Sequence, residues 1–185
     1  MKLSTGDIWT LVAVVLLTGV AAFLAMSETS VTRTNRIRAV HLEEENRRGA
    51  RQLRALVEQP ARSLNLILLL TLVVQFAATS LFTSVLERVV GGGLSVALAA
   101  AIMTVVTFIF AEVAPKTYAV QHTDRAALRI APLVWWLTRL PVLGPLTRLL
   151  IGIGNVITPG KGLKSGPFVS EDELRAMVDE AEREE

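Results

Sequence analysis

An acidic side chain, Glu112, lies near the end of a long apolar run in the stretch FIFAEVAPKTYA, and Pro115 and Lys116 follow it closely. An ionisable group at membrane depth costs about 2.5–3.5 kcal/mol, so such residues commonly belong to functional sites. Because proline has no N–H, Pro115 leaves the Ala111 carbonyl, four residues earlier, without its helical hydrogen bond. A carboxylate beside a free carbonyl offers the hard oxygen ligands that magnesium and calcium take.

Two further sets of polar residues are expected at a similar depth. One set closes another apolar run with Ser27, Glu28, Thr29 and Ser30. If the runs are helices, Ser27 and Glu112 each lie roughly 27–29 Å from the start of their helix, near one membrane boundary. Thr71 and Gln75 lie roughly 10 and 16 Å into a helix that enters from that boundary. Together with the Ala111 carbonyl, these residues predict a cation site built from hard oxygens.

The same residues also have explanations that need no cation. Glu112 and Lys116 are four residues apart and can form an ion pair on one helix face. Glu28, at the end of its run, can reach water, and hydroxyl groups in membrane helices often bond to their own backbone. Residue types and spacing therefore leave both a cation site and static polar packing open.

Three apolar segments must position these side chains. Hydrophobic residues make up 51% of the 185 residues, and residues 8–26, 64–86 and 94–113 are each long enough to cross a bilayer. A cleaved signal peptide is the competing interpretation of the first segment. It is disfavoured by Asp7 in the leader and by Ser-Glu-Thr where a cleavage site should be. Three such lengths in one small chain also disfavour buried helices of a soluble protein, and VVGGG at 89–93 predicts a tight turn between the last two spans.

Positive charge predicts the orientation of the spans. Between the first two spans lie Arg33, Arg36, Arg38, Arg47, Arg48, Arg51, Arg54 and Arg62, and after the third lie Lys116, Arg125, Arg129, Arg139 and Arg148. Only Arg88 lies between spans two and three. The positive-inside rule therefore places the N-terminus outside and the C-terminus in the cytoplasm of a multi-pass protein of the plasma (inner) membrane.

The basic segment at 32–59 shows helical spacing of apolar residues with a break at 46–49, and Pro60 ends it. Two short amphipathic helices against the anionic inner leaflet fit this pattern, and a solvated helical hairpin is the alternative. Residues 132–157 are apolar enough for a fourth span, but Arg139, Pro141 and Arg148 favour a broken helix at the inner interface, anchored by Trp135 and Trp136. The expected interfacial belt covers residues 124–157.

Residues 1–157 therefore form the expected transmembrane domain, and residues 158–185 a linker and an acidic helix. Ser170 and Glu173 match a capping box at the start of that helix. Its narrow apolar stripe predicts a covering partner or a further domain.

Several classes of site are disfavoured by composition. The chain has no cysteine and two histidines far apart in sequence, which excludes disulfides and thiolate chemistry and disfavours a zinc site. No nucleophile–base pair is evident, and VVGGG lacks the lysine of a phosphate-binding loop, so we do not expect an enzyme. The basic stretches lack interleaved aromatic residues, so we do not expect a nucleic-acid partner.

Three motifs are similar to those of the CorC/CNNM family of magnesium transporters: S-E-T at 27–29, N-R-x-R at 35–38 and E-x-x-P-K-T at 112–117. The order of the elements also agrees, and the resemblance to the family's membrane domain covers nearly the whole chain.

The resemblance implies an all-α homodimer with three transmembrane helices per protomer, a helical hairpin between spans one and two, and a juxtamembrane amphipathic belt. It implies a cytoplasm-facing cavity that holds Mg²⁺, whose export is driven by Na⁺ entry. Ser27 and Glu112 would line that cavity, with Thr29 and the Ala111 carbonyl next. The acidic segment would lead to cytoplasmic nucleotide-binding CBS-pair domains that this sequence does not contain.

Span two departs from the family pattern. Relatives usually carry an Asn-rich G-N-N-x-x-N stretch that helps to hold the ion, whereas this chain reads LTLVVQ at 70–75, with only Thr71 and Gln75 polar. Ala111 replaces the usual glycine before the glutamate, and Met26 precedes S-E-T where many relatives have a small residue. The expected function is a magnesium transporter membrane domain, and the alternative is a non-transporting scaffold or regulator that anchors cytoplasmic domains.

Overall fold

The computed structural model describes residues 4–140 together with residues 145, 149 and 152. The chain divides into two units, Met1–Thr147 and Arg148–Glu185, and the helices below belong to the first. Every regular element of the described part is a helix, which confirms the predicted all-α class. The linker and the acidic helix expected at 158–185, and most of residues 141–157, lie outside the described residues.

Three long helical runs are apolar enough to cross a membrane. They are α1 (Thr5–Arg33), α4 (Pro60–Val90), and the consecutive α5 (Leu94–Val106), η1 (Thr107–Val113) and α6 (Ala114–Gln121). The prediction of three spans is confirmed, and each helix extends beyond its apolar core. At the start of α1, for example, Ser4 and Asp7 form a capping box, so the helix begins before the apolar run.

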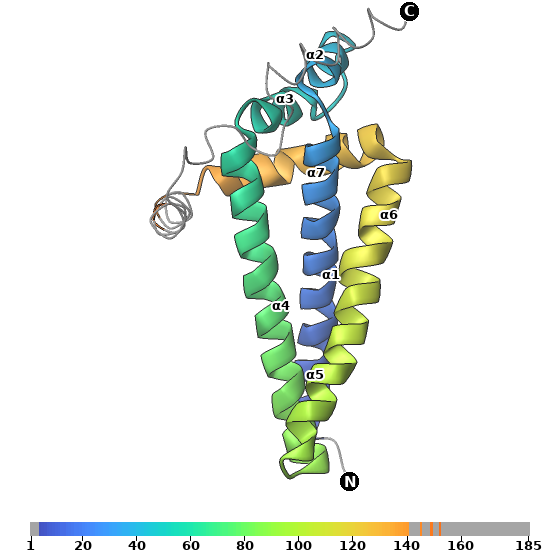
Figure 1. The fold of residues 1–185 in the computed structure, drawn as a ribbon, viewed down its shortest axis with the longest axis vertical. Coiled ribbons are helices and arrows are strands. Elements are labelled where there is room, and N and C mark those ends of the chain that lie inside the picture. The colour runs from blue at the N-terminus through green and yellow to red at the C-terminus, as the bar shows by residue number, and fades with distance from the viewer. Residues whose placement is uncertain (1–3, 141–144, 146–148, 150–151, 153–185) are drawn as a thin grey trace, which may run out of the picture. The chain divides into compact units, whose positions relative to one another are not determined.

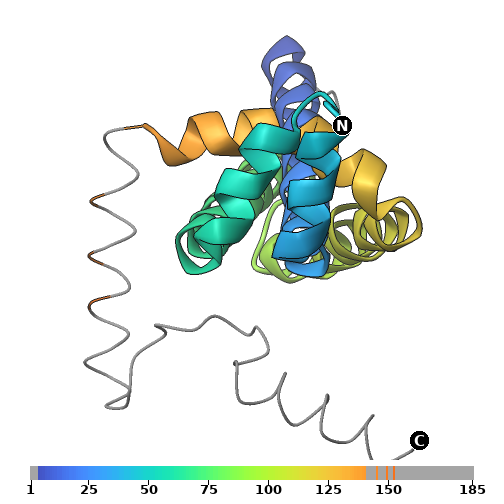
Figure 2. The same cartoon turned by 90° about the horizontal axis from the view of Figure 1, so that it is seen from above.

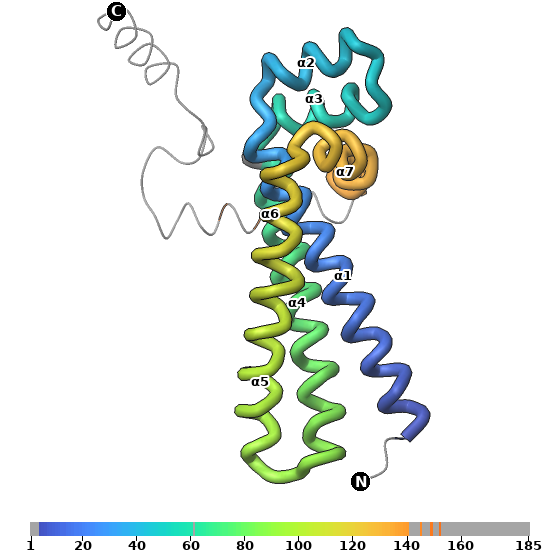
Figure 3. Tube along the Cα trace, turned by 90° about the vertical axis from the view of Figure 1, so that its right-hand side faces the viewer, coloured from blue at the N-terminus to red at the C-terminus, as the bar shows by residue number. Residues whose placement is uncertain are grey.

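Within the bundle of spans, the second and third spans diverge toward one end, which we call the wide end. Gly91 and Gly92, with φ of 70° and 72°, make the turn that joins α4 to α5. Figure 1 shows α4 and α6 diverging from that turn, and Figure 3 shows α1 crossing beside them at a tilt; α1 packs along α4, η1 and α6. At the narrow end, Arg88 Nε donates to Asp7 Oδ1 at 2.8 Å and ties the end of α4 to the start of α1.

Shorter helices cover the wide end of the bundle. α2 (Arg36–Glu44) and α3 (Ala50–Glu58) are separated close to the break expected at 46–49, and Figure 2 shows them side by side. α7 (Thr123–Thr138) lies across the ends of the spans (Figures 1 and 3) and packs against α3. Arg62 of α4 donates to the Thr138 carbonyl at 3.0 Å. That these helices lie at a membrane surface stays a prediction.

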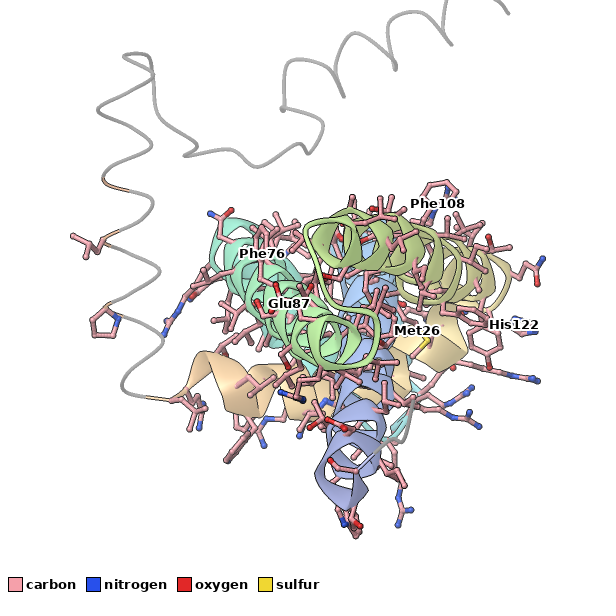
Figure 4. All side chains as sticks on the ribbon, turned by 90° about the horizontal axis from the view of Figure 1, so that it is seen from below. Met26, Phe76, Glu87, Phe108 and His122 are labelled. Carbon is pink, nitrogen blue, oxygen red and sulfur yellow. The ribbon has the colours of Figure 1, made fainter. Side chains whose placement is uncertain are left out.

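Large apolar side chains cover the outside of the spans. Trp9 and Phe76 are each 70% exposed and Phe108 is 62% exposed, and Figure 4 shows Phe108 projecting away from the bundle. Between the spans, Val14, Ala78 and Met103 form one buried apolar cluster. Such a surface requires an apolar surrounding, as a bilayer provides.

Candidate cation site

One ammonium group joins two carboxylates from different spans. Lys116 Nζ lies 2.7 Å from Glu112 Oε2 on its own helical run and 3.3 Å from Glu28 Oε2 on α1. The first contact is the ion pair that the four-residue spacing allowed. The second joins α1 to α6 and brings the S-E-T and E-x-x-P-K-T motifs together, as the depth estimate predicted.

The second span completes the group. Gln75 Nε2 of α4 donates to Glu112 Oε1 at 3.1 Å, so each oxygen of the Glu112 carboxylate has a partner. The four polar side chains from three spans form what we call the Glu–Lys cluster: Glu28, Gln75, Glu112 and Lys116. The three side chains that form the ion pairs are each about a third exposed (27% for Glu28, 33% for Glu112, 37% for Lys116), so a small ion can reach them.

A π-helical segment carries Glu112. Through η1 the backbone bonds five residues back instead of four, and at its end the Ala114 N–H donates to the Ile109 carbonyl. The next amide is missing because residue 115 is proline. A Pro115 N–H would have met Phe110 in the five-residue register or Ala111 in the four-residue one. Single π turns within α-helices are frequent at functional sites.

The predicted hydroxyl ligands bond to their own helices. Ser27 donates to the Phe23 carbonyl at 2.7 Å, and Thr71 donates to the Ile67 carbonyl at 2.8 Å. Both side chains are buried, and their oxygens keep lone pairs that can accept. Thr29 is half-buried, one residue after Glu28.

Ser30 belongs to the polar set that the sequence places at this depth, but it was not among the predicted ligands. Its side chain is fully buried, and its hydroxyl has no hydrogen-bond partner within the described part of the chain. A buried polar atom without a partner costs about 1–3 kcal/mol. Ser30 follows Thr29 directly, so this cost is carried beside the S-E-T motif.

The oxygen ligands of the cluster determine which kind of cation it can bind. Among the described residues, no three His, Cys, Asp or Glu side chains lie close enough to share a metal ion. A cation here would meet two carboxylates, and amide, hydroxyl or carbonyl oxygens would supply its other ligands, as suits a hard ion such as Mg²⁺. An ammonium already lies between the two carboxylates, so the geometry accommodates one cation.

The sequence predicted two features of the site to different extents. The Glu28–Lys116 contact joins residues 88 positions apart, and counting residues along the helices predicted their common depth but not the ion pair itself. The five-residue register of η1 has only one signal, Pro115, and that proline also fits an ordinary helix start.

Comparisons with known proteins match most of the chain. The family model described as Cyclin M transmembrane N-terminal domain matches residues 11–185. UPF0053 protein Rv2366c of Mycobacterium tuberculosis is 32% identical over 172 residues, which are 91% of this chain and 38% of that protein. UPF0053 inner membrane protein YfjD of Escherichia coli is 32% identical over 167 residues, 88% of this chain and 38% of that protein.

A plant protein is similar as well. DUF21 domain-containing protein At1g55930, chloroplastic, of Arabidopsis thaliana is 36% identical over 171 residues, 90% of this chain and 25% of that protein. The chain thus spans about 38% of the length of its bacterial relatives.

Proposed function

Since this chain is a multi-pass membrane protein of the CNNM family, defined by the Cyclin M transmembrane N-terminal domain, we propose that it is the membrane domain of a magnesium transporter. The observation that supports this most is the Glu–Lys cluster. Three spans contribute to it, and two carboxylates share one cation at the end of the charge-free part of the bundle. Ionisable groups at this depth are costly and commonly mark an ion pathway.

Mg²⁺ would enter the cluster in exchange for the Lys116 ammonium. Both carboxylates contact that ammonium, at 2.7 and 3.3 Å, so a divalent ion must compete with it. Once displaced, the flexible lysine stem can carry the ammonium toward water. Ser27, Thr29, Thr71 and the Ala111 carbonyl are the neutral oxygens that we assign to the remaining ligand positions, together with the Gln75 amide.

We place export, driven by Na⁺ entry, in a homodimer whose helices rock about the site. The unmatched length of the relatives leaves room for cytoplasmic domains, which we propose to be nucleotide-binding CBS pairs. In this arrangement the wide end of the bundle faces the cytoplasm.

A non-transporting scaffold or regulator is the second candidate. Both Glu112 oxygens are already bonded, and Thr71 donates to its own backbone. These contacts would be sufficient in a protein that kept the fold and no longer moved an ion.

Binding of Mg²⁺ to the purified chain separates the two candidates. Wild-type protein should melt at a higher temperature with Mg²⁺. At a hundred times the dissociation constant a ligand stabilises by about 2.7 kcal/mol, which corresponds to about 5–10 °C for a chain of this size. Glu112→Gln should lose most of that rise, because it removes a charged ligand.

Glu87→Gln is the matched control, since Glu87 is exposed near the opposite end of α4. It should melt as wild type does at every Mg²⁺ concentration. If Glu112→Gln keeps the full Mg²⁺ response, Glu112 is not a ligand and the scaffold explanation is preferred. Flux of Mg²⁺ into or out of proteoliposomes, with and without a Na⁺ gradient, then tests transport directly.

A further inference from the structure

A second charged site lies away from the Glu–Lys cluster. A pocket of about 400 Å³ is formed by the α2–α3 turn and α7, and none of its lining residues belongs to a spanning helix. Four arginines line it: Arg47, Arg48, Arg125 and Arg129. Arg125 and Arg129 are four residues apart and therefore share one face of α7.

A backbone contact holds the two pairs of arginines together. Gly49, which follows Arg48, has φ of +86°, and a Cβ there would lie 2.2 Å from the Leu128 carbonyl oxygen. That carbonyl has no helical donor, because the residue four positions later is Pro132. Only glycine permits both this dihedral and this approach, so close packing brings the turn against α7.

The arginines have few counter-charges. Arg47 has a carboxylate oxygen of Glu45 at 3.8 Å, and no carboxylate of the described residues lies within 4.0 Å of the other three. Asp124, the acid next to them in sequence, accepts from Arg38, whose pKa it raises through that hydrogen bond. Like charges held close together repel one another unless an anion lies between them.

Two local features fit an anion. Gly49 is also the N-cap of α3, and no side chain caps that helix start, so its partial positive charge adds to that of the arginines. Trp135 and Trp136 lie further along α7, with Arg139 3.6 Å from the Trp135 ring centre. Tryptophans on a helix across the end of the spans are typical of the headgroup level of a bilayer.

We propose that this arginine pocket binds a phosphate group, supplied by an anionic phospholipid of the leaflet next to α7. One guanidinium group can donate two parallel hydrogen bonds to two oxygens of a phosphate, which gives both affinity and a fixed orientation. Leu128 and Pro132 provide an apolar wall beside the arginines. The proposal is independent of cation transport.

Charge-matched variants test the pocket. Arg48→Gln with Arg129→Gln removes one arginine from each wall of the pocket. Arg33→Gln with Arg51→Gln removes the same charge from exposed positions that do not line it. Native mass spectrometry of the full chain measures retention of phosphatidylglycerol against phosphatidylcholine. Thermal melting with added inorganic phosphate tests whether a soluble phosphate binds the pocket instead.

The pocket variant should retain phosphatidylglycerol about tenfold more weakly than wild type, because two charged, paired contacts are lost. The control variant should stay within about twofold, as expected of unspecific surface charge. If instead inorganic phosphate raises the melting temperature of wild type and control but not of the pocket variant, the phosphate site stands and its ligand is soluble. Equal lipid retention and equal phosphate response in all three proteins would overturn the proposal.

Discussion

Lys116 has the central role among individual residues, because the two acidic side chains of the cluster meet through it. Its contacts at 2.7 and 3.3 Å make it both a structural tie between α1 and α6 and a competitor for any entering cation. The first role stabilises the protein without a cation, and the second opposes cation binding. The contacts of Lys116 with the two carboxylates must therefore break when a cation binds.

Replacing Lys116 by methionine separates the two roles. Without Mg²⁺, Lys116→Met should lower the melting temperature, since two carboxylates lose their shared counter-charge. The Mg²⁺ concentration at half-maximal stabilisation should fall by about tenfold or more, because a charge-assisted hydrogen bond contributes about 1.5–3 kcal/mol. Lys116→Arg, which keeps the charge, serves as the control. An unchanged Mg²⁺ midpoint in Lys116→Met would show that the ammonium does not block the site.

Much of the residue-level site was predictable. Glu28, Glu112 and Lys116 were expected at one depth because depth follows from counting residues along apolar helices. The pairing of Gln75 with Glu112 was not predictable, because it depends on how α4 and η1 are rotated about their axes. Ser30 was one of several similar hydroxyls, and burial without a partner is a property of packing alone.

At the scale of elements, the third span is two α-helices joined by a π segment. The register changes at Thr107, whose hydroxyl also donates to the Met103 carbonyl, and returns at Ala114, just before Pro115. The sequence predicted a helix here from its apolar length, but helix length carries no information on whether backbone bonds span four or five residues. The bounds of α2 and α3 were predicted better, since apolar spacing and the Gly49 turn define them.

Pro115→Ala tests the π segment. The variant supplies an amide hydrogen, so a four-residue register can continue through residues 107–116 and turn Glu112 relative to Gln75. We expect equal or higher melting temperature without Mg²⁺ and a smaller Mg²⁺-dependent rise. Pro132→Ala, a second proline inside a helix but remote from the Glu–Lys cluster, is the control. A Mg²⁺ response equal to wild type in Pro115→Ala would mean that the π register does not position the carboxylate.

At the scale of the whole molecule, the positively charged side chains are concentrated at one end of the bundle. The turn between α4 and α5 carries no lysine or arginine beyond Arg88, which is paired with Asp7. The arginine-rich α2, α3 and α7 all lie at the other end (Figure 3). The number of spans followed from the sequence, whereas the divergence of α4 from α6 did not, because helix crossing depends on side-chain packing.

Orientation can be tested with single cysteines, since the chain has none of its own. Gly93→Cys is tolerated sterically, with φ of −65° and no atom within 4 Å of an added Cβ; Gln121 is exposed at the end of α6. In intact cells a membrane-impermeant maleimide should label Gly93→Cys and should label Gln121→Cys only after permeabilisation. Unmodified protein is the blank. The reverse labelling pattern would invert the orientation and the expected direction of transport.

The seat of Gly49 on the Leu128 carbonyl has a mechanical consequence. It couples α7 to α3, and the hydrogen bond from Arg62 to Thr138 fastens the far end of α7 to the beginning of α4. A pull on the polypeptide beyond residue 138 therefore does not act on the third span alone. It is transmitted through α7 to α4 as well as to α6, so a force on the chain after α7 acts on two membrane helices.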